Sequence, residues 1–394
     1  MLEENLARFV LPADLKLRAV RKVLKGYIWE VEKLRQPFET CPKCATPSKV
    51  RAGRCVAKVK DEPFRDEQLW LEIHKHRYFC KTCKKPFTEP VSIVWPKRKT
   101  TGRLRKSVAT ACANFIDLER VRKRFGVSSG FIYSVFYEQL EVKLRERKVA
   151  PWPEVLGIDE HFFRRQTSFT EFVTVFTDLN RRVLFEMGLG KNNQSLIEQL
   201  SHIPGRERVR VVAIDLSSGY RALVRKLFPN AKIVADKFHA LRLIGPSIMK
   251  EGKTIHGHRQ ELKLRRLLLV NRPSLDYFTR ADLDQYLVRH PKLNELYRTK
   301  EWVYEFYRIK GYNRAVKAFA RLADRMKASA LSEVQRLRKT MLAWRDEILL
   351  YFKTGYTNAF TEAMNNVGKL VQKRAYGYRS FENYRLRTQC ARLF

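Results

Sequence analysis

The middle of the chain carries a long succession of strand and helix patterns, and this succession restricts the fold more than any other feature. Seven elements are predicted, and in chain order they cover residues 155–163, 171–178, 182–189, 193–203, 209–214, 219–227 and 231–235. The first three are strands, and the second and third are rich in Val, Phe and Thr. The remaining four alternate between helix and strand. The expected order is therefore βββαβαβ.

A meander of three strands followed by alternating helices and strands is typical of an α/β fold, and this order is that of a ribonuclease-H-like core. The first part of the core is assigned to residues 151–240. From 241 to 355 the pattern is almost wholly helical. Because so long a stretch cannot be a simple loop, it is predicted to be a helical insertion. Helices within 356–394 then complete the core.

In two of the predicted strands, an apolar run leads directly to an acid. The apolar runs Val-Leu-Gly-Ile and Val-Val-Ala-Ile lead to Asp159 and Asp215. If these strands are parallel neighbours, both carboxylates lie at one rim of the sheet and can share a divalent cation. Glu362, on the late helix, can complete the site. Phosphodiester chemistry uses such carboxylates to hold two metal ions about 3.5–4 Å apart, which activate the attacking oxygen and stabilise the leaving oxygen.

The same acids also admit a structural interpretation, as strand-end caps or salt-bridge partners of nearby arginines. The shared topology favours the metal site. Asp236 ends a third strand and could support the site, while His239 could either serve the site or cap a helix. Glu160 is the weaker candidate, because adjacent residues of a strand point to opposite faces.

The composition indicates a polyanionic partner. The chain has 79 Lys and Arg against 41 Asp and Glu, a net charge of +38, and the cations are spread along its length. This distribution favours an extended nucleic-acid-binding surface over a solubility surface or a surface for acidic membranes. No apolar run approaches the roughly 20 residues that cross a bilayer. The N-terminus also lacks a secretory signal, so a cytoplasmic protein without a membrane partner is expected.

Residues 1–100 are predicted to form a zinc-binding module. Four of the seven cysteines occur as two C-x-x-C pairs, Cys41/Cys44 and Cys80/Cys83, which is typical of a tetrahedral site for one structural Zn2+. An odd cysteine count makes a disulfide framework the poorer explanation. The 35 residues between the pairs exceed the usual ribbon spacing, so they must fold as an excursion. Three other side chains are alternative ligands: Cys55, His74 and His76.

Residues 101–150 predict a helix-turn-helix. Helix patterns at 118–125 and 129–140 are separated by a short Gly-Val-Ser turn whose serine can act as an N-cap. A helical hairpin without a DNA-binding role is the alternative. In a DNA-reading helix, the residues placed near the major groove are Ser128, Ser129 and Tyr133.

The late helix and the segment after it predict contacts with phosphates. Steps of three and four residues bring Glu362 onto one helical face with an amide and two lysines. The alternative is a solvated helix surface. The following segment, residues 373–379, interleaves aromatic and cationic side chains, which suits backbone and base contacts. The predicted DNA-binding residues here are Asn366, Lys369, Lys373, Arg374 and Arg379.

The order of these motifs resembles that of the ISL3 family of bacterial insertion-sequence transposases, and the resemblance covers nearly the whole chain. After the cysteine pairs and the helix-turn-helix, the motifs are Gly157-Ile158-Asp159-Glu160, Asp215-x-Ser217-x-Gly219-Tyr220, Asp236-Lys237-Phe238-His239, Thr357-Asn358-x-x-x-Glu362-x-x-Asn365-Asn366-x-x-Lys369 and Tyr376-Gly377-Tyr378. The late motif is the most specific. Ala363 departs from the glycine expected after the acid, and the charged residues 60–67 put the shape of the zinc module in doubt.

The resemblance implies a DDE transposase that uses two Mg2+ (or Mn2+) ions to cut at terminal inverted repeats and join 3′-hydroxyl ends to target DNA. Asp159, Asp215 and Glu362 match the catalytic positions of the family, and the helical stretch before Glu362 matches its insertion. The implied partners are double-stranded DNA, as element ends and as target, and a second copy of the chain in a homodimeric DNA complex. A nucleoid-associated bacterial protein is expected.

Two other functions compete with this one. A non-catalytic DNA-binding regulator derived from a transposase would need the DNA-binding modules and not the acids. A ribonuclease-H-like structure-specific nuclease would cut branched DNA without making strand-transfer products. The presence of all three acids favours the enzyme over the regulator.

Overall fold

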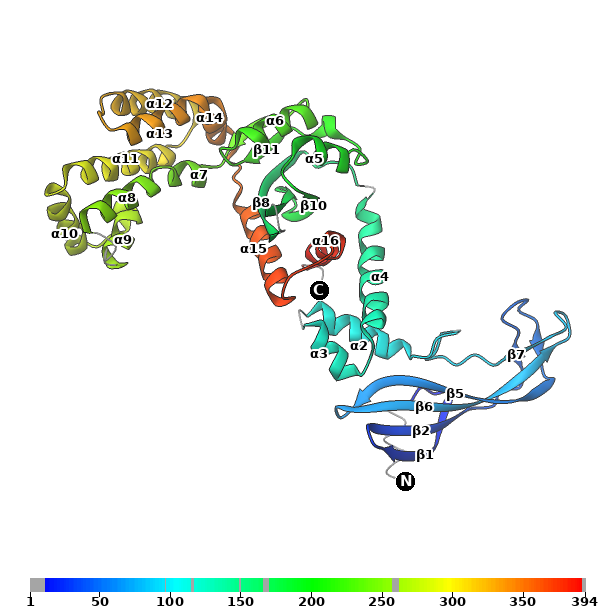
Figure 1. Cartoon of the computed structure of the whole chain (residues 1–394). Helices are drawn as coiled ribbons and strands as arrows, with labels where there is room; N and C mark the ends of the chain where they lie inside the picture. The colour runs from blue at the N-terminus through cyan, green and yellow to red at the C-terminus, as the bar shows by residue number, and fades with distance from the viewer. Residues whose placement is uncertain are drawn as a thin grey trace. The chain divides into compact units, whose positions relative to one another are not determined.

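The computed structural model describes residues 11–95, 97–114, 117–148, 150–165, 170–256 and 262–391 (Figure 1). The chain divides into two compact units. The first unit comprises Met1–Arg145 and Val371–Phe394, and the second comprises Glu146–Leu370. The end of the chain therefore belongs with the N-terminal unit. The finer division into five segments stays a prediction.

The N-terminal part of the first unit is a twisted antiparallel and parallel sheet. Its strands are β1 (Leu15–Val23), β2 (Gly26–Lys33), β5 (Arg51–Phe64), β6 (Glu67–Cys80) and β7 (Lys85–Thr88). β5 and β6 form a long hairpin, β2 pairs parallel with β6, and β1 and β7 pair antiparallel with β2 and β6. Leu69, Leu71 and Ile73 alternate onto the buried face of β6. The predicted excursion between the cysteine pairs is thus mostly this hairpin.

The charged residues 60–67 form the end of the β5–β6 hairpin. Asp61 is fully buried there and accepts hydrogen bonds from Thr101 Oγ1 (2.6 Å) and Arg103 Nε (2.7 Å). Burial of a carboxylate is tolerated because these donors replace its water. The contact joins the sheet to the helix Gly102–Ala113.

The described part of the first unit also contains the helices α2 (Gly102–Ala113), α3 (Leu118–Phe125), α4 (Ser129–Lys148) and α16 (Phe381–Cys390). Asp117 caps α3 by accepting from the Arg120 N–H, and Gly126 ends α3 with a left-handed φ of 57°. Leu386 and Cys390 of α16 share a hydrophobic cluster with α2, α3 and α4. The two helices predicted around the Gly-Val-Ser turn are present.

The second unit is built on a five-stranded sheet with the order β10-β9-β8-β11-β12. Its elements are β8 (Val155–Arg165), β9 (Thr170–Asp178), β10 (Val183–Leu189), α5 (Asn193–Gln199), β11 (Val211–Ile214), α6 (Ser218–Leu227) and β12 (Lys232–Ala235). β8, β9 and β10 form an antiparallel meander, whereas β8, β11 and β12 run parallel. The predicted βββαβαβ order is observed.

A long helical stretch follows β12, as predicted. Its helices are α7 (Lys237–Arg242), α8 (Gly245–His256), α9 (Leu262–Leu269), α10 (Tyr277–Val288), α11 (Pro291–Arg308), α12 (Tyr312–Lys327), α13 (Ser332–Ala343) and α14 (Arg345–Thr354). One cluster of buried apolar side chains extends from the sheet into these helices. Arg221 of α6 pairs with Glu347 of α14 at 2.9 Å and lies 3.6 Å from the Trp344 ring centroid. These contacts hold the helical stretch to the core.

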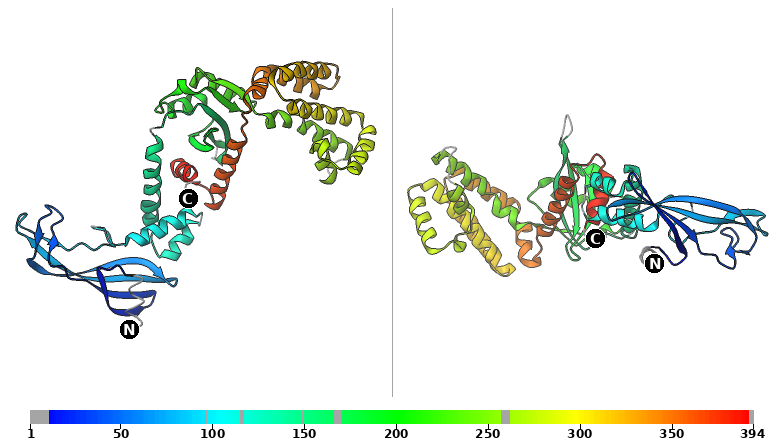
Figure 2. Two further views of the ribbon diagram at one scale, coloured as in Figure 1. Left: turned by 180° about the vertical axis from the view of Figure 1, so that it is seen from behind. Right: turned by 90° about the horizontal axis from the view of Figure 1, so that it is seen from below.

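Helix α15 (Ala359–Arg374) then returns to the sheet, and Figures 1 and 2 show its first turns beside β8. Across the part of the chain that the structure describes, no helix is both long and apolar enough to cross a membrane.

Candidate catalytic and zinc sites

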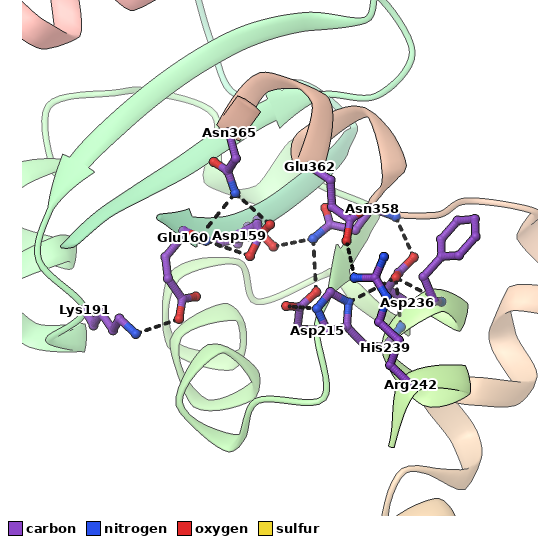
Figure 3. Close-up of polar contacts among 12 residues, drawn as sticks. Asp159, Glu160, Lys191, Asp215, Asp236, His239, Arg242, Asn358, Glu362 and Asn365 are labelled. Atoms are coloured by element: carbon purple, nitrogen blue, oxygen red, sulfur yellow. Dashed lines mark hydrogen bonds and ion pairs between the residues drawn. The ribbon is translucent and has the colours of Figure 1, made fainter. Parts of the chain in front are cut away.

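Asp159, Asp215 and Glu362 are brought to one region of the second unit (Figure 3). β8 and β11 are parallel neighbours whose last paired residues are Gly157 and Ala213, so the two aspartates follow at equivalent positions two residues further on. Glu362 lies in the first turn of α15. The three predicted acids therefore come from two neighbouring strands and a helix of one compact unit.

Asp159 is largely buried, with 9% of its surface exposed. Its burial, reinforced by the nearby Asp215 carboxylate, raises the pKa of Asp159 to about 7. Two donors orient its oxygens: Asn365 Nδ2 at 2.7 Å and the Glu160 N–H at 2.8 Å. Such a carboxyl is held in one orientation and is poised to lose its proton to a cation near neutral pH.

His239 lies between two acids. Its Nε2 is 2.8 Å from Asp215 Oδ2, and its Nδ1 is 3.2 Å from Asp236 Oδ2. Hydrogen bonds to Asp215 and Asp236 raise the pKa of His239 to about 10, so the ring is a cation at neutral pH. Potential ligand atoms of these three residues all lie within 4.8 Å of one another. His239 was considered either as part of the carboxylate site or as a helix cap. Its ring contacts two acids, Asp215 and Asp236.

Asp236, the predicted supporting acid, is fully buried. It caps α7 by accepting from the N–H groups of Phe238 (3.1 Å) and His239 (3.3 Å), and it accepts from the Asn358 N–H (3.0 Å). Burial alone would raise the pKa of Asp236, but hydrogen bonds from His239 and Asn358 outweigh it and lower the pKa. Asp236 thus positions His239 and the start of α15.

Glu362 and Glu160 are engaged by cations. Arg242 Nη1 lies 3.2 Å from Glu362 Oε1, and 29% of the Glu362 side chain is exposed. Lys191 Nζ lies 2.7 Å from Glu160 Oε1, as Figure 3 shows. Glu362 therefore faces solvent and an arginine, while Glu160 is paired with a lysine.

Polar side chains on one face of α15 fix this helix against β8. Asn358 Nδ2 donates to Ile158 O (2.9 Å) and to Asp215 Oδ1 (3.4 Å). Thr361 Oγ1 lies 2.7 Å from Thr177 Oγ1, and Asn365 Nδ2 reaches Glu160 O at 3.3 Å in addition to Asp159. These buried contacts fix the position of Glu362 relative to both aspartates.

Gly157 makes the close approach of α15 feasible. A Cβ atom at this position would lie 2.1 Å from Thr361 Oγ1, 2.8 Å from Thr177 Oγ1 and 2.9 Å from Asn358 Oδ1. No real Cβ contact is so short, so any other residue would push the helix away from the strand.

Asn365 is the site residue that sequence reasoning missed. The choice of Asn366 rested on a four-residue step from Glu362, but Asn366 is exposed and Asn365 is buried. A usable signal was present, because Asn358, Thr361 and Asn365 recur at steps of three and four and all are polar. A buried polar stripe on a helix indicates partners on the facing element.

The predicted DNA-binding residues lie at surfaces. Ser128 caps α4 by accepting from the Phe131 N–H at 3.1 Å, and Ser129 beside it is exposed. Tyr133 is 44% exposed and stacks on Tyr137, with ring centroids 5.1 Å apart. Five other predicted residues are exposed: Asn366, Lys369, Lys373, Arg374 and Arg379. Their contacts with DNA stay a prediction.

The four predicted zinc ligands are clustered in the first unit. The Sγ atoms of Cys41, Cys44, Cys80 and Cys83 all lie within 4.8 Å of one another, and hydrogen bonds from Thr46 lower the pKa of the Cys44 thiol. The first pair lies between the short strands β3 (Glu39–Thr40) and β4 (Pro47–Ser48). In the second pair, Cys80 is the last residue of β6, and Cys83 lies in the turn between β6 and β7. Four thiolates in this arrangement suit tetrahedral Zn2+.

The three alternative zinc ligands lie outside this cluster of described residues. His76 instead pairs with Glu89, at 3.4 Å. Cys55 and His74 belong to the β5–β6 hairpin, where they pair with Lys75 and Val56 of the opposite strand. The two C-x-x-C pairs are therefore sufficient for the site.

Comparison with known proteins agrees with these features. A family model described as a transposase, of the ISL3 type, matches residues 156–388. A second model, described as the zinc-finger of transposase IS204/IS1001/IS1096/IS1165, matches residues 37–83, which include all four clustered cysteines. The transposase for insertion sequence element IS1001 of Bordetella parapertussis is 24% identical over 373 residues, covering 89% of this chain and 88% of the relative. The four clustered cysteines within the zinc-finger match support a structural zinc. Because the first match spans more than half of the chain, this protein belongs to the ISL3 family of insertion-sequence transposases.

Proposed function

We propose that this protein is a DDE transposase that cuts DNA at the ends of its insertion sequence and joins the freed 3′-hydroxyl ends to target DNA. The catalytic core would be ribonuclease-H-like, formed by β8–β12, α5, α6 and the first turns of α15. The main support is that Asp159 and Asp215 occupy equivalent positions along the parallel strands β8 and β11. Glu362 lies on α15, which is docked to β8.

The donor set fits two Mg2+ (or Mn2+) ions. Asp159, Asp215 and Glu362 offer carboxylate oxygens, which hard divalent cations prefer. Bound there, such ions would activate the attacking oxygen and stabilise the leaving oxygen. Asp159 would lose its proton on binding, and Glu362 would exchange Arg242 for the cation. Arg242 could then contact a DNA phosphate.

The two chemical steps use the same groups. In the first, a water oxygen bonds to phosphorus at the element end, and the bond from phosphorus to the 3′-oxygen breaks, leaving a 3′-hydroxyl. In the second, this 3′-oxygen bonds to a target phosphorus and displaces a target 3′-oxygen. The chain itself holds Asp159 through Asn365, and Asp215 through His239 and Asn358.

DNA recognition would fall to the first unit. We assign α3 and α4 as a helix-turn-helix for the terminal inverted repeats, with Ser128, Ser129 and Tyr133 near the bases. Exposed residues would contact phosphates from both units: Lys373, Arg374 and Arg379 from the first, and Asn366 and Lys369 from the second. Because two ends must be joined in one event, the DNA complex would be a homodimer on bacterial chromosomal DNA in the cytoplasm.

The test uses duplexes copied from the DNA that flanks the gene, where inverted repeats should occur. The full-length protein should cut them in Mg2+ and not in EDTA, and should join the cut ends to plasmid DNA. An end terminated by a 3′-deoxynucleotide should not be joined. Binding without cutting would support the regulator instead, and cutting of branched DNA without joined products would support the nuclease.

A further inference from the structure

A cavity of about 350 Å³ lies in the first unit, between α3, α4 and the turn that precedes α16. None of its lining residues belongs to the carboxylate site or the zinc site. The side chains that decide its chemistry are Tyr133, Tyr137, Tyr376, Tyr378, Arg374 and Arg379. Its volume is at the lower end of the range for small-ligand sites.

Aromatic rings form the inner part of the cavity. Tyr133 and Tyr137 are stacked with an interplanar angle of 14°, and Tyr137 is buried while Tyr133 is 44% exposed. The Tyr378 hydroxyl is hydrogen-bonded to that of Tyr137, and burial raises the pKa of both phenols. Both therefore stay neutral at physiological pH and do not repel a phosphate.

Tyr376 is held at the rim in a strained conformation. It has a left-handed φ of 53°, is followed by Gly377 with φ of 99°, and is 93% exposed. Bulky residues rarely adopt this conformation, and an aromatic ring normally gains free energy from burial. The turn thus presents an open aromatic face beside a cavity already lined by aromatic rings.

The charge of the rim is positive. Arg374 and Arg379 line it, as do two acids, Asp117 and Glu119. Both acids already have cationic partners on α3: Asp117 pairs with Arg120 at 3.1 Å, and Glu119 pairs with Arg122 at 2.7 Å. Their charges are therefore largely compensated, and Arg374 and Arg379 place two guanidinium groups at the rim.

We propose that this cavity receives one unstacked nucleobase of bound DNA, with the base against the rings of Tyr376 and Tyr133 and the flanking phosphates near Arg374 and Arg379. A flat ring suits a cavity with aromatic side chains on more than one side, and cations at the rim suit the phosphates on either side of the base. Asn383, also in the lining, offers an amide to the edge of the base. The inference rests on the proposed function in assuming that DNA is the ligand.

The test compares two duplexes of identical sequence, one fully paired and one carrying a single unpaired 2-aminopurine nucleotide. The full-length protein should bind the second duplex more tightly and quench the fluorescence of its 2-aminopurine by stacking. Tyr376→Ala should reduce this preference by about 5- to 150-fold, the range that a stacking free energy of about 1–3 kcal/mol per base gives. Tyr376→Phe should retain it, because stacking does not need the hydroxyl.

The matched control is Tyr277→Ala, which removes a tyrosine that is 76% exposed on α10. It should leave both affinities unchanged. Equal binding of the two duplexes by the unmodified protein, without quenching, would overturn the inference. So would a Tyr376→Ala protein that keeps the full preference and the full quenching.

Cutting and joining of element ends in Mg2+ separate this inference from the proposed function. A protein that cuts and joins but does not distinguish the two duplexes contradicts the cavity assignment alone. A protein that prefers the unpaired nucleotide but neither cuts nor joins contradicts the proposed catalytic function alone.

Discussion

At the scale of single residues, the environment of Asp159 sets the properties of the carboxylate site. Its carboxyl group is removed from water, lies near Asp215, and accepts hydrogen bonds from the Asn365 amide and the Glu160 N–H. Without a cation, ionisation of Asp159 is therefore unfavourable. The site stores an electrostatic cost that a bound divalent cation would relieve.

We expect Asp159→Asn to stabilise the protein in EDTA at pH 8. The ordinary pKa of an aspartate is 3.8, and that of Asp159 in the folded chain is about 7, so rising pH ionises the unfolded chain first. The free energy of unfolding therefore falls as the pH rises from 3.8 to about 7, by about 1.36 kcal/mol per pH unit. Above pH 7 the total loss is at most about 4 kcal/mol. Urea unfolding should show a higher free energy of unfolding for Asp159→Asn than for the unmodified protein at pH 8. At pH 5.5 this difference should be about half as large. The exposed Asp346→Asn is the control, and no gain for Asp159→Asn at pH 8 would contradict the assignment.

We expect Asn365→Ala to lower the rate of DNA cutting by about 10- to 100-fold, because groups that orient a metal ligand have effects of this size. The variant removes the donor to Asp159, so a higher Mg2+ concentration should restore part of the rate. The measurement is the cutting rate as a function of Mg2+ concentration. Asn230→Ala, which removes only a contact with the Glu207 carbonyl, is the control. An unchanged Mg2+ dependence in Asn365→Ala would refute this role.

The acids could be predicted from the sequence because an apolar run that ends on an aspartate is a local pattern. Asn365 could not be predicted, because its neighbour is also an asparagine. Which of the two faces β8 depends on how the helix is rotated about its axis when it docks. That rotation is set by Gly157 and Thr361, which are 204 residues apart in the chain. His239 was left between two roles for the same reason, since its contact with Asp215 depends on how two strands and α7 meet.

At the scale of elements, the docking of α15 on β8 determines whether the carboxylates can act together. The interface is polar and tightly packed, with Asn358, Thr361 and Asn365 facing the strand across Gly157. Polar contacts specify one register of the helix more strictly than apolar packing does. A small shift would move Glu362 away from the aspartates.

Gly157→Ala should therefore lower the free energy of unfolding by about 1–3 kcal/mol, the usual cost of overpacking, and should reduce cutting more than DNA binding. Gly219→Ala is a matched control, because its Cβ would meet only Ser217 Oγ at 3.6 Å. Thermal unfolding and cutting assays on both variants provide the measurement. Equal behaviour of the two would show that the close approach of α15 is not required.

The zinc site should stabilise the ends of the β3–β4 ribbon and the β6–β7 hairpin. We expect Cys80→Ser to lose the one zinc ion per chain and to become sensitive to protease within residues 37–88, because a structural zinc site contributes directly to folding. Cys55→Ser, outside the cluster, should keep its zinc. Metal analysis and limited proteolysis give the readout. One zinc ion retained by Cys80→Ser would contradict a four-cysteine site.

Most elements of the core were predictable because each carries its own periodicity, as the strands 155–165, 170–178 and 211–214 show. Pairing between distant segments was not. The parallel contact of β2 with β6 and the inclusion of residues 371–394 in the first unit depend on contacts across long sequence separations. The segment between the cysteine pairs was predicted as an excursion and not as a hairpin. The charged residues 60–67 at its end interrupt the alternating apolar pattern that indicates two paired strands.

At the scale of the whole molecule, a charge of +38 is combined with a small group of buried or partly buried acids. The cations occur in both units, whereas the three acids of the proposed catalytic centre lie in the second. The proposed function would therefore draw affinity from the basic surface and chemistry from the carboxylates. The central claim is that Asp159, Asp215 and Glu362 bind the catalytic ions directly.

The most direct measurement is a change of metal specificity in Asp215→Cys. A thiolate binds Mg2+ poorly and softer cations such as Mn2+ better. The variant should therefore fail to cut element ends in Mg2+ and recover cutting in Mn2+, whereas the exposed Asp346→Cys should cut in both. Cutting by Asp215→Cys in Mg2+ at the unmodified rate would contradict direct metal binding by Asp215 and with it the proposed catalytic centre.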